Sequence, residues 1–300
     1  MYPDARLVGV SGSLAAGTCT VLRLMDGNTD TEYVPFTEKP VLSVETATPV
    51  CSVALRLPDG TVHELRAEGK GVHSEQTFVF IDRLLAREKL AVNDLGAVIV
   101  SAGPGSYTGL RVASSAVKGL LFQTDVPLYA CRTLGAIALG AMYAMHAMRQ
   151  ADAGPAADNV LAEASHIHKN RAEVPGDGFL HVAGCDAVID ARRNHLYHQS
   201  WTFLKEGMEP ESDVEVRELE EILERWKSGR LVVGTGVERL KEITSGTLQR
   251  TVKMPVLSSQ DVVNASNILA ALGRFPGAQL HKLIKKVAPE RFEPYYYTGL

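Results

Sequence analysis

The chain has 300 residues, of which 45% are hydrophobic and 22% charged, and its formal net charge is -4 at pH 7. This length and composition are typical of a globular protein with one large or two medium-sized domains, and the negative balance gives no general attraction to nucleic acid or membranes. The four cysteines lack C-x-x-C spacing, which favours reduced, buried thiols in a cytoplasmic protein over a disulfide scaffold or a zinc site.

The first 40 residues predict little regular structure. Residues 7–17 resemble the apolar part of a signal peptide, but Asp4 offsets Arg6 before them and serine and glycine dilute them, so we favour an added N-terminal segment. The longest apolar stretch, residues 134–147, is shorter than the roughly 18 residues that a membrane span needs. It predicts a buried helix.

After this extension, strand-like and helix-like patterns alternate. We expect strands at residues 41–44, 52–57, 61–66, 97–100 and 127–130, and helices at 75–87, 107–123 and 133–150. The tripeptide Pro58-Asp59-Gly60 is a turn signal between the second and third strands. A strand-rich start followed by strand–helix units favours an α/β fold with a mixed sheet.

The second half begins with residues 151–178, whose polar, glycine- and proline-containing composition predicts a long surface loop. Beyond it we expect strands at 187–190, 196–203 and 231–233, and helices at 216–227, 259–272 and around 279–287. Glu45 and Asp190 each end a strand with a carboxylate before a turn into the next strand. This is a faint sign of internal duplication.

Residues 97–123 carry the most informative pattern, a buried strand, a Gly-Pro-Gly-Ser turn and a long helix. Gly103 and Gly105 allow backbone angles closed to other residues, and Ser106 and Thr108 are good N-cap residues. Such a turn is either a phosphate cradle or a plain structural turn. The spacing of the turn matches neither the P-loop nor the dinucleotide-binding motif. The two interpretations, a phosphate cradle and a structural turn, both stay open.

Four segments in order resemble one family. They are Gly103-Pro-Gly-Ser-Tyr-Thr-Gly-Leu-Arg111, residues 41–55, His73-Ser-Glu-Gln-Thr77 and Asp190-Ala-Arg-Arg-Asn-His-Leu-Tyr197, and they are similar to motifs of the TsaB (YeaZ) family. The resemblance implies a two-lobed actin-like or sugar-kinase-like fold (ASKHA, ribonuclease-H-like) with mixed sheets. Residues 41–133 would form the N-terminal lobe and 134–300 the C-terminal lobe, whose final segment packs back on the first; residues 1–40 lie outside the resemblance.

The resemblance also implies a function. The chain would be a non-catalytic scaffold and activator in the complex that forms N6-threonylcarbamoyladenosine in tRNAs reading ANN codons. Its partners would be a TsaD-type paralogue, a TsaE-type ATPase and a second copy of itself, with tRNA contacted only indirectly and no membrane involved. We expect no cofactor on this chain, ATP entering at the level of the complex.

Two sets of residues are candidates for function. The nucleotide-binding candidates are Glu45, Gly103, Gly105, Ser106 and Asp190. The partner-binding candidates, on the two helices through which the family dimerises, are His73, Glu75, Phe78, Ile81, Leu85, Thr108, Leu110, Arg111, Ser115 and Lys118. No metal site is expected, because the second histidine that TsaD-type paralogues carry one helical turn after the first is Thr77 here.

Two other functions compete with the scaffold. The chain could be an active ATP-dependent kinase or transferase of the same superfold, using Glu45, Asp190, the 103–106 turn and Gly234-Thr235-Gly236. It could also be a free-standing homodimeric binding protein. A serine hydrolase is excluded by the missing G-x-S-x-G motif.

Overall fold

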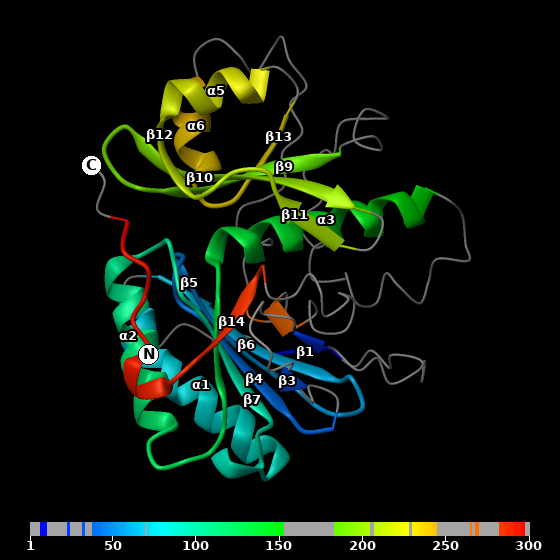
Figure 1. Cartoon of the computed structure of the whole chain (residues 1–300), viewed down its shortest axis with the longest axis vertical. Coiled ribbons are helices and arrows are strands. Elements are labelled where there is room, and N and C mark those ends of the chain that lie inside the picture. The colour runs from blue at the N-terminus through cyan, green and yellow to red at the C-terminus, as the bar shows by residue number, and fades with distance from the viewer. Residues whose placement is uncertain are drawn as a thin grey trace. The chain divides into compact units, whose positions relative to one another are not determined.

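The structure, a computed structural model, describes residues 7–10, 23–24, 32–33, 38–69, 71–152, 183–204, 207–227, 230–244, 265, 268–269 and 282–297. The chain divides into two compact units (Figure 1), Met1–Thr133 with Asn264–Tyr296 and Leu134–Val263 with Tyr297–Leu300. Among the described helices, none is both long and apolar enough to cross a membrane.

The first unit is built on a seven-stranded mixed sheet. Its strands are β1 (Leu7–Val10), β4 (Val41–Glu45), β5 (Val50–Arg56), β6 (Val62–Glu68), β7 (Ala97–Ser101), β8 (Leu128–Cys131) and β14 (Ile284–Val287). They lie in the order β1-β6-β5-β4-β7-β8-β14. The β4, β7 and β8 strands are parallel, β5 is antiparallel to β4 and β6, and both outer strands are antiparallel to their neighbours.

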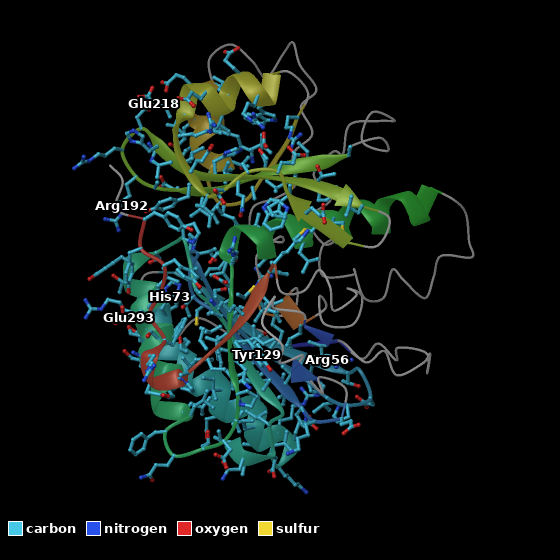
Figure 2. All side chains as sticks on the ribbon, viewed as in Figure 1. Arg56, His73, Tyr129, Arg192, Glu218 and Glu293 are labelled. Atoms are coloured by element: carbon cyan, nitrogen blue, oxygen red, sulfur yellow. The ribbon has the colours of Figure 1, made fainter. Side chains whose placement is uncertain are left out.

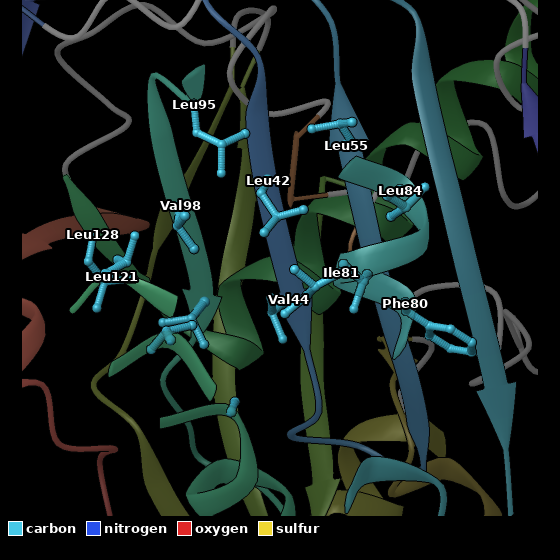
Figure 3. Packing of buried hydrophobic residues seen from close by; sticks show 14 of the residues in the cluster. Leu42, Val44, Leu55, Phe80, Ile81, Leu84, Leu95, Val98, Leu121 and Leu128 are labelled. Atoms are coloured by element: carbon cyan, nitrogen blue, oxygen red, sulfur yellow. The ribbon is translucent and has the colours of Figure 1, made fainter. Parts of the chain in front are cut away.

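Two helices, α1 (Val72–Glu88) and α2 (Tyr107–Leu120), pack against this sheet and against each other. Alternate residues of the strands point towards them, so Leu42 and Val44 meet Ile81 and Leu84 in one apolar cluster (Figure 3). Burying each such side chain contributes roughly 1.5–3 kcal/mol to folding. The α2 helix ends three residues earlier than the sequence predicts, and Gln123 beyond it has a left-handed φ of 57°.

The C-terminal segment belongs to the first unit. The predicted helix around residues 279–287 is wrong where the structure describes it, because Ile284–Val287 form β14 and pair antiparallel with β8. A short 3-10 helix follows at Pro289–Arg291, and Phe292 is buried in the core formed by the sheet and its helices. Pairing with an open sheet edge outweighs helix propensity here, since an unpaired edge leaves backbone groups unsatisfied.

The second unit contains β9 (Gly184–Asp190), β10 (His195–Leu204), β11 (Gly207–Pro210), β12 (Glu215–Glu218), β13 (Leu231–Val233), α5 (Leu219–Lys227) and α6 (Val237–Thr244). Its path is β11-β10-β9-β13, with β12 also paired to β10. The predicted helix at 216–227 therefore begins only at Leu219. Residues 216–218 form a strand because β10 offers them an open edge. The α3 helix (Thr133–Asp152) starts at the boundary of the two units, and its residues Leu134–Leu139 are largely buried.

Some predictions lie mostly outside the described residues. The 151–178 loop is described only at its first two residues, which extend α3. Of the 259–272 helix, Ala265, Ile268 and Leu269 are described and are helical. In the N-terminal extension, β1 pairs with β6, and β2 (Arg23–Leu24) pairs with β3 (Glu32–Tyr33).

The two units repeat one arrangement. In the first, β4, β5 and β6 form a meander, followed by α1, by β7 parallel to β4, and by α2. In the second, β9, β10 and β12 form a meander, followed by α5, by β13 parallel to β9, and by α6. The repeat places Glu45 and Asp190 at corresponding positions, each at the end of the first strand.

Candidate functional site

Glu45 ends β4 and is completely buried. Its Oε1 accepts hydrogen bonds from the backbone N–H groups of Ala47 at 2.7 Å and Thr48 at 3.1 Å, and its Oε2 accepts one from the Ser101 hydroxyl. Burial raises the pKa of Glu45 to about 8, although the two N–H groups lower it. The carboxyl group therefore caps the β4–β5 turn and is largely protonated at pH 7.

The glycine-rich turn lies directly against that capped turn. Ser106 donates its N–H to the carbonyl of Ala47 at 2.7 Å, and its hydroxyl caps α2 by accepting from the Gly109 N–H at 3.2 Å. A Cβ at Gly105 would collide with the Ala47 carbonyl, and one at Gly109 with the Thr46 carbonyl. These glycines allow backbone to meet backbone within the protein.

Gly103 is tied into the same turn from its other side. Its N–H donates to the Thr133 hydroxyl at 3.0 Å, and its carbonyl accepts from the Thr133 N–H at 3.0 Å. The backbone N–H groups of Gly103 and Ser106 therefore donate to acceptors within the protein, whereas the N–H groups of a phosphate cradle point at the ligand. The geometry favours the structural interpretation of the turn.

Asp190 caps the corresponding turn of the second unit. Its Oδ1 accepts from the Arg192 N–H at 2.8 Å and pairs with Arg239 at 3.2 Å, while Arg239 also donates to the Arg193 carbonyl at 2.7 Å. Arg192, labelled in Figure 2, and Arg193 both have left-handed φ angles, 70° and 51°. Asp190 is exposed, so the two carboxylates share a role in their turns and differ in environment.

His73 ties α1 to the β4–β5 turn. The Nε2 of His73, which is labelled in Figure 2, lies 2.8 Å from the Thr48 carbonyl oxygen. Thr77, where a second metal-binding histidine would stand, is buried and donates its hydroxyl to the His73 carbonyl at 2.6 Å. Within the described residues, no group of three or more His, Cys, Asp or Glu is arranged to hold a metal.

The partner-binding candidates separate by burial. Glu75, Phe78, Thr108, Arg111 and Ser115 are exposed, and His73 and Lys118 are partly buried. Ile81, Leu85 and Leu110 are buried in the unit's own packing, so any partner surface on α1 and α2 excludes them. The sequence placed these three residues on the two predicted partner-binding helices, but helical periodicity alone did not say which residues face the sheet.

The second unit contains a buried charge network that the sequence analysis did not predict. Asp186 is completely buried on β9 and accepts from Arg225 Nε at 2.7 Å, Arg230 Nε at 3.2 Å and the Ser200 hydroxyl at 2.7 Å, and His198 Nε2 lies 3.3 Å away. Burial by itself would raise the pKa of Asp186, but hydrogen bonds from His198, Arg225 and Ser200 hold it well below its ordinary value. An aspartate within an apolar strand pattern was the one available signal.

Three comparisons with known proteins bear on this arrangement. The family model of TsaD, described as tRNA N6-adenosine threonylcarbamoyltransferase, matches residues 68–185. Among curated proteins, the tRNA threonylcarbamoyladenosine biosynthesis protein TsaB of Haemophilus influenzae is 35% identical over 101 residues, which are 34% of this chain and 42% of that protein. TsaB of Escherichia coli is 32% identical over 101 residues, covering 34% and 43%. The matched part thus spans less than half the length of these relatives.

Among solved structures, YeaZ from Pseudomonas aeruginosa matches with a TM-score of 0.58 and 22% identity, covering 86% of this chain and 100% of that one. The duplicated α/β architecture with mixed sheets is the actin-like, ASKHA-type fold, which confirms the predicted fold class. Within that class, the chain is similar in sequence to the TsaB proteins over 34% of its length and in fold to YeaZ.

Proposed function

We propose that the chain takes part in forming N6-threonylcarbamoyladenosine in tRNAs reading ANN codons, as a non-catalytic subunit that scaffolds and activates the transferase. Support for the pathway comes from the curated TsaB relatives, which are named for this modification. The observation that carries the non-catalytic role is Glu45. Its side chain is buried and largely protonated at pH 7, and both of its oxygens accept hydrogen bonds from the protein itself.

The partners follow from the same proposal. A TsaD-type paralogue docks on the exposed face of α1 and α2, which carries Glu75, Phe78, Thr108, Arg111 and Ser115, with the partly buried Lys118 beside them. A TsaE-type ATPase completes the assembly, a second copy of this chain competes for the same face, and tRNA is reached through the paralogue. The chain works in the cytoplasm without a cofactor of its own, and ATP enters through the complex.

An active kinase or transferase of the same superfold would make other demands on these residues. A strand-end carboxylate that holds a magnesium–phosphate group must be ionised and open to its ligand. Glu45 is neither. Asp190 is exposed, so Asp190→Ala is the variant that tests for a nucleotide site. If the isolated chain binds a nucleotide and this substitution abolishes the binding, the enzyme is favoured.

The decisive experiment is reconstitution. The TsaD-type and TsaE-type proteins of the same organism are incubated with unmodified tRNA, ATP and threonylcarbamoyl-AMP, with and without this chain, and the modified nucleoside is measured by mass spectrometry. We expect modification only when the chain is present, and none from the chain alone. Equal modification without the chain would contradict the scaffold role.

A further inference from the structure

Aromatic side chains from distant parts of the chain meet at the start of α2. The ring centroids of Tyr107, the first residue of α2, and Tyr296, near the C-terminus, are 5.1 Å apart, with planes tilted by 48°. Arg111, one helical turn along α2, lies 5.4 Å from the centroid of the Tyr107 ring and donates from Nη1 to the Tyr107 hydroxyl at 2.9 Å. We call Tyr107, Arg111, Tyr295 and Tyr296 the tyrosine cluster.

The backbone beneath the cluster is firmly held. Tyr295 donates its N–H to the Ala102 carbonyl at 2.7 Å, and a Cβ at Gly103 would lie only 2.7 Å from the Tyr295 carbonyl oxygen. Phe292, three residues earlier, is buried in the core. The rings are therefore positioned in advance, which lowers the entropy that a binding partner would have to pay for.

The cluster is nevertheless open to solvent. Tyr107 is 55% exposed, Tyr295 43% and Tyr296 42%. Aromatic side chains stabilise a fold mainly by being buried, so rings half in water contribute little to this unit's own stability. Tyrosine and arginine are also the residue types that concentrate the binding energy of protein interfaces.

Arg111 brings a positive charge to the cluster, and its side chain is exposed. Within the described part of the chain, the Arg111 guanidinium contacts the Tyr107 side chain and makes no ion pair. A carboxylate of a binding partner would accept a charge-assisted hydrogen bond from the Arg111 guanidinium. At Tyr107 an RNA base is the poorer fit, because stacking needs an open ring face, Arg111 already lies over this ring and the Tyr296 ring packs against it.

We propose that the tyrosine cluster anchors a second protein subunit, which presents a carboxylate to Arg111 and an apolar side chain to the rings of Tyr107 and Tyr296. The inference rests on the proposed function, in which this subunit is the TsaD-type paralogue. Thr108 and Ser115, exposed on the same helix, continue the surface along α2. The C-terminal tyrosines thereby join an interface that the sequence assigned to α1 and α2 alone.

The test measures the Kd of the full-length chain for the purified TsaD-type paralogue by titration calorimetry. Tyr296→Ala and Arg111→Ala are each expected to weaken binding roughly 30-fold, the scale of an interface hot spot. Tyr296→Phe keeps the ring and is expected to bind within about threefold of the wild type. Ile243→Ala, which truncates a 47% exposed side chain on α6 of the other unit, is the matched control and leaves Kd unchanged.

Further measurements on the same variants separate the outcomes. Unfolding midpoints equal to the wild type show that lost binding is not lost folding, and the reconstituted reaction reports the proposed function independently. Wild-type affinity in Tyr296→Ala and Arg111→Ala would overturn the inference and leave the function standing. Weakened binding, in a system whose tRNA modification does not need the chain, would support the inference and overturn the function.

Three other results would also overturn the inference. One is loss of tRNA binding in the variants with paralogue binding intact, which would assign the cluster to RNA. Another is conversion of a dimer of this chain to a monomer in sedimentation experiments, again with paralogue binding intact, which would assign it to a second copy. The last is the absence of any paralogue binding by the wild type.

Discussion

Two buried carboxylates in this protein reach opposite charge states. Glu45 and Asp186 are both removed from water, which favours the neutral form of each. The hydrogen-bond partners of Glu45 are neutral, and its pKa rises to about 8. Asp186 accepts hydrogen bonds from two arginines, Arg225 and Arg230, and its pKa falls well below the ordinary value. The partners, more than the depth of burial, decide which carboxylate stays ionised.

The raised pKa of Glu45 predicts a pH dependence of stability. Since this group binds its proton more tightly in the folded state, its stabilising contribution is complete below its unfolded pKa of about 4.5 and is lost as the pH rises towards 8. The free energy of unfolding should fall by up to about 1.4 kcal/mol per pH unit between these values. Glu45→Gln should remove this slope while preserving the turn, as measured by urea unfolding at pH 5, 6, 7 and 8. Glu75→Gln, at an exposed position, is the control that keeps the slope; a slope retained in Glu45→Gln would contradict the assignment.

At the scale of elements, the contact between α2 and the β4–β5 turn defines the candidate site. Thr46 donates its hydroxyl to the Gly109 carbonyl at 2.8 Å, and Ser106 donates its N–H to Ala47. This approach is closer than side chains would permit, so glycine is required at Gly105 and Gly109. The turn that resembled a phosphate cradle instead joins the helix to the end of the central strand.

Gly109→Ala should therefore destabilise the protein strongly, although alanine is the better helix former. The added Cβ must displace the Thr46 backbone, and we expect a cost of about 3 kcal/mol in the free energy of unfolding. Gly119→Ala on the same helix is the matched control, because the nearest atom to its Cβ is Phe78 Cζ at 4.0 Å. That variant should gain roughly 0.5–1 kcal/mol from helix propensity. Equal effects of the two substitutions in chemical denaturation would refute the close approach.

At the scale of the whole molecule, distant parts of the chain build one unit. The central strands come from residues 41–101, while β14 completes one sheet edge and Phe292 enters the core formed with α1 and α2. Folding of the first unit therefore depends on a segment that comes after residues 134–263 of the second unit in the sequence. The same segment carries two of the four members of the tyrosine cluster.

Phe292→Ala tests whether the C-terminal segment completes the core of the first unit. Truncating a buried phenylalanine costs about 3–5 kcal/mol, so the urea midpoint of the first unit should fall markedly. Phe122→Ala removes the same side chain where it is 73% exposed, and its effect should stay within about 0.5 kcal/mol. Two variants of equal stability would mean that the C-terminal segment does not contribute to the core.

The sequence by itself determined the α/β class and most elements of the first unit. Regular patterns such as the apolar run ending at Val100 and the Gly-Pro-Gly-Ser turn are local signals, and local signals survive into the structure. The motifs at residues 41–55, 73–77, 103–111 and 190–197 likewise indicated the TsaB (YeaZ) family, to whose members the comparisons find the chain similar.

Only the tertiary structure decided which residues lie inside and which lie open. Residues 284–287 form a strand because the edge of β8 is available to them, and residues 216–218 do so because β10 is. The burial of Ile81 and Leu110, the ionised Asp186 and the meeting of Tyr107 with Tyr296 all depend on contacts between segments far apart in the chain. No local pattern encodes such contacts, because each needs partners that only the folded chain brings together.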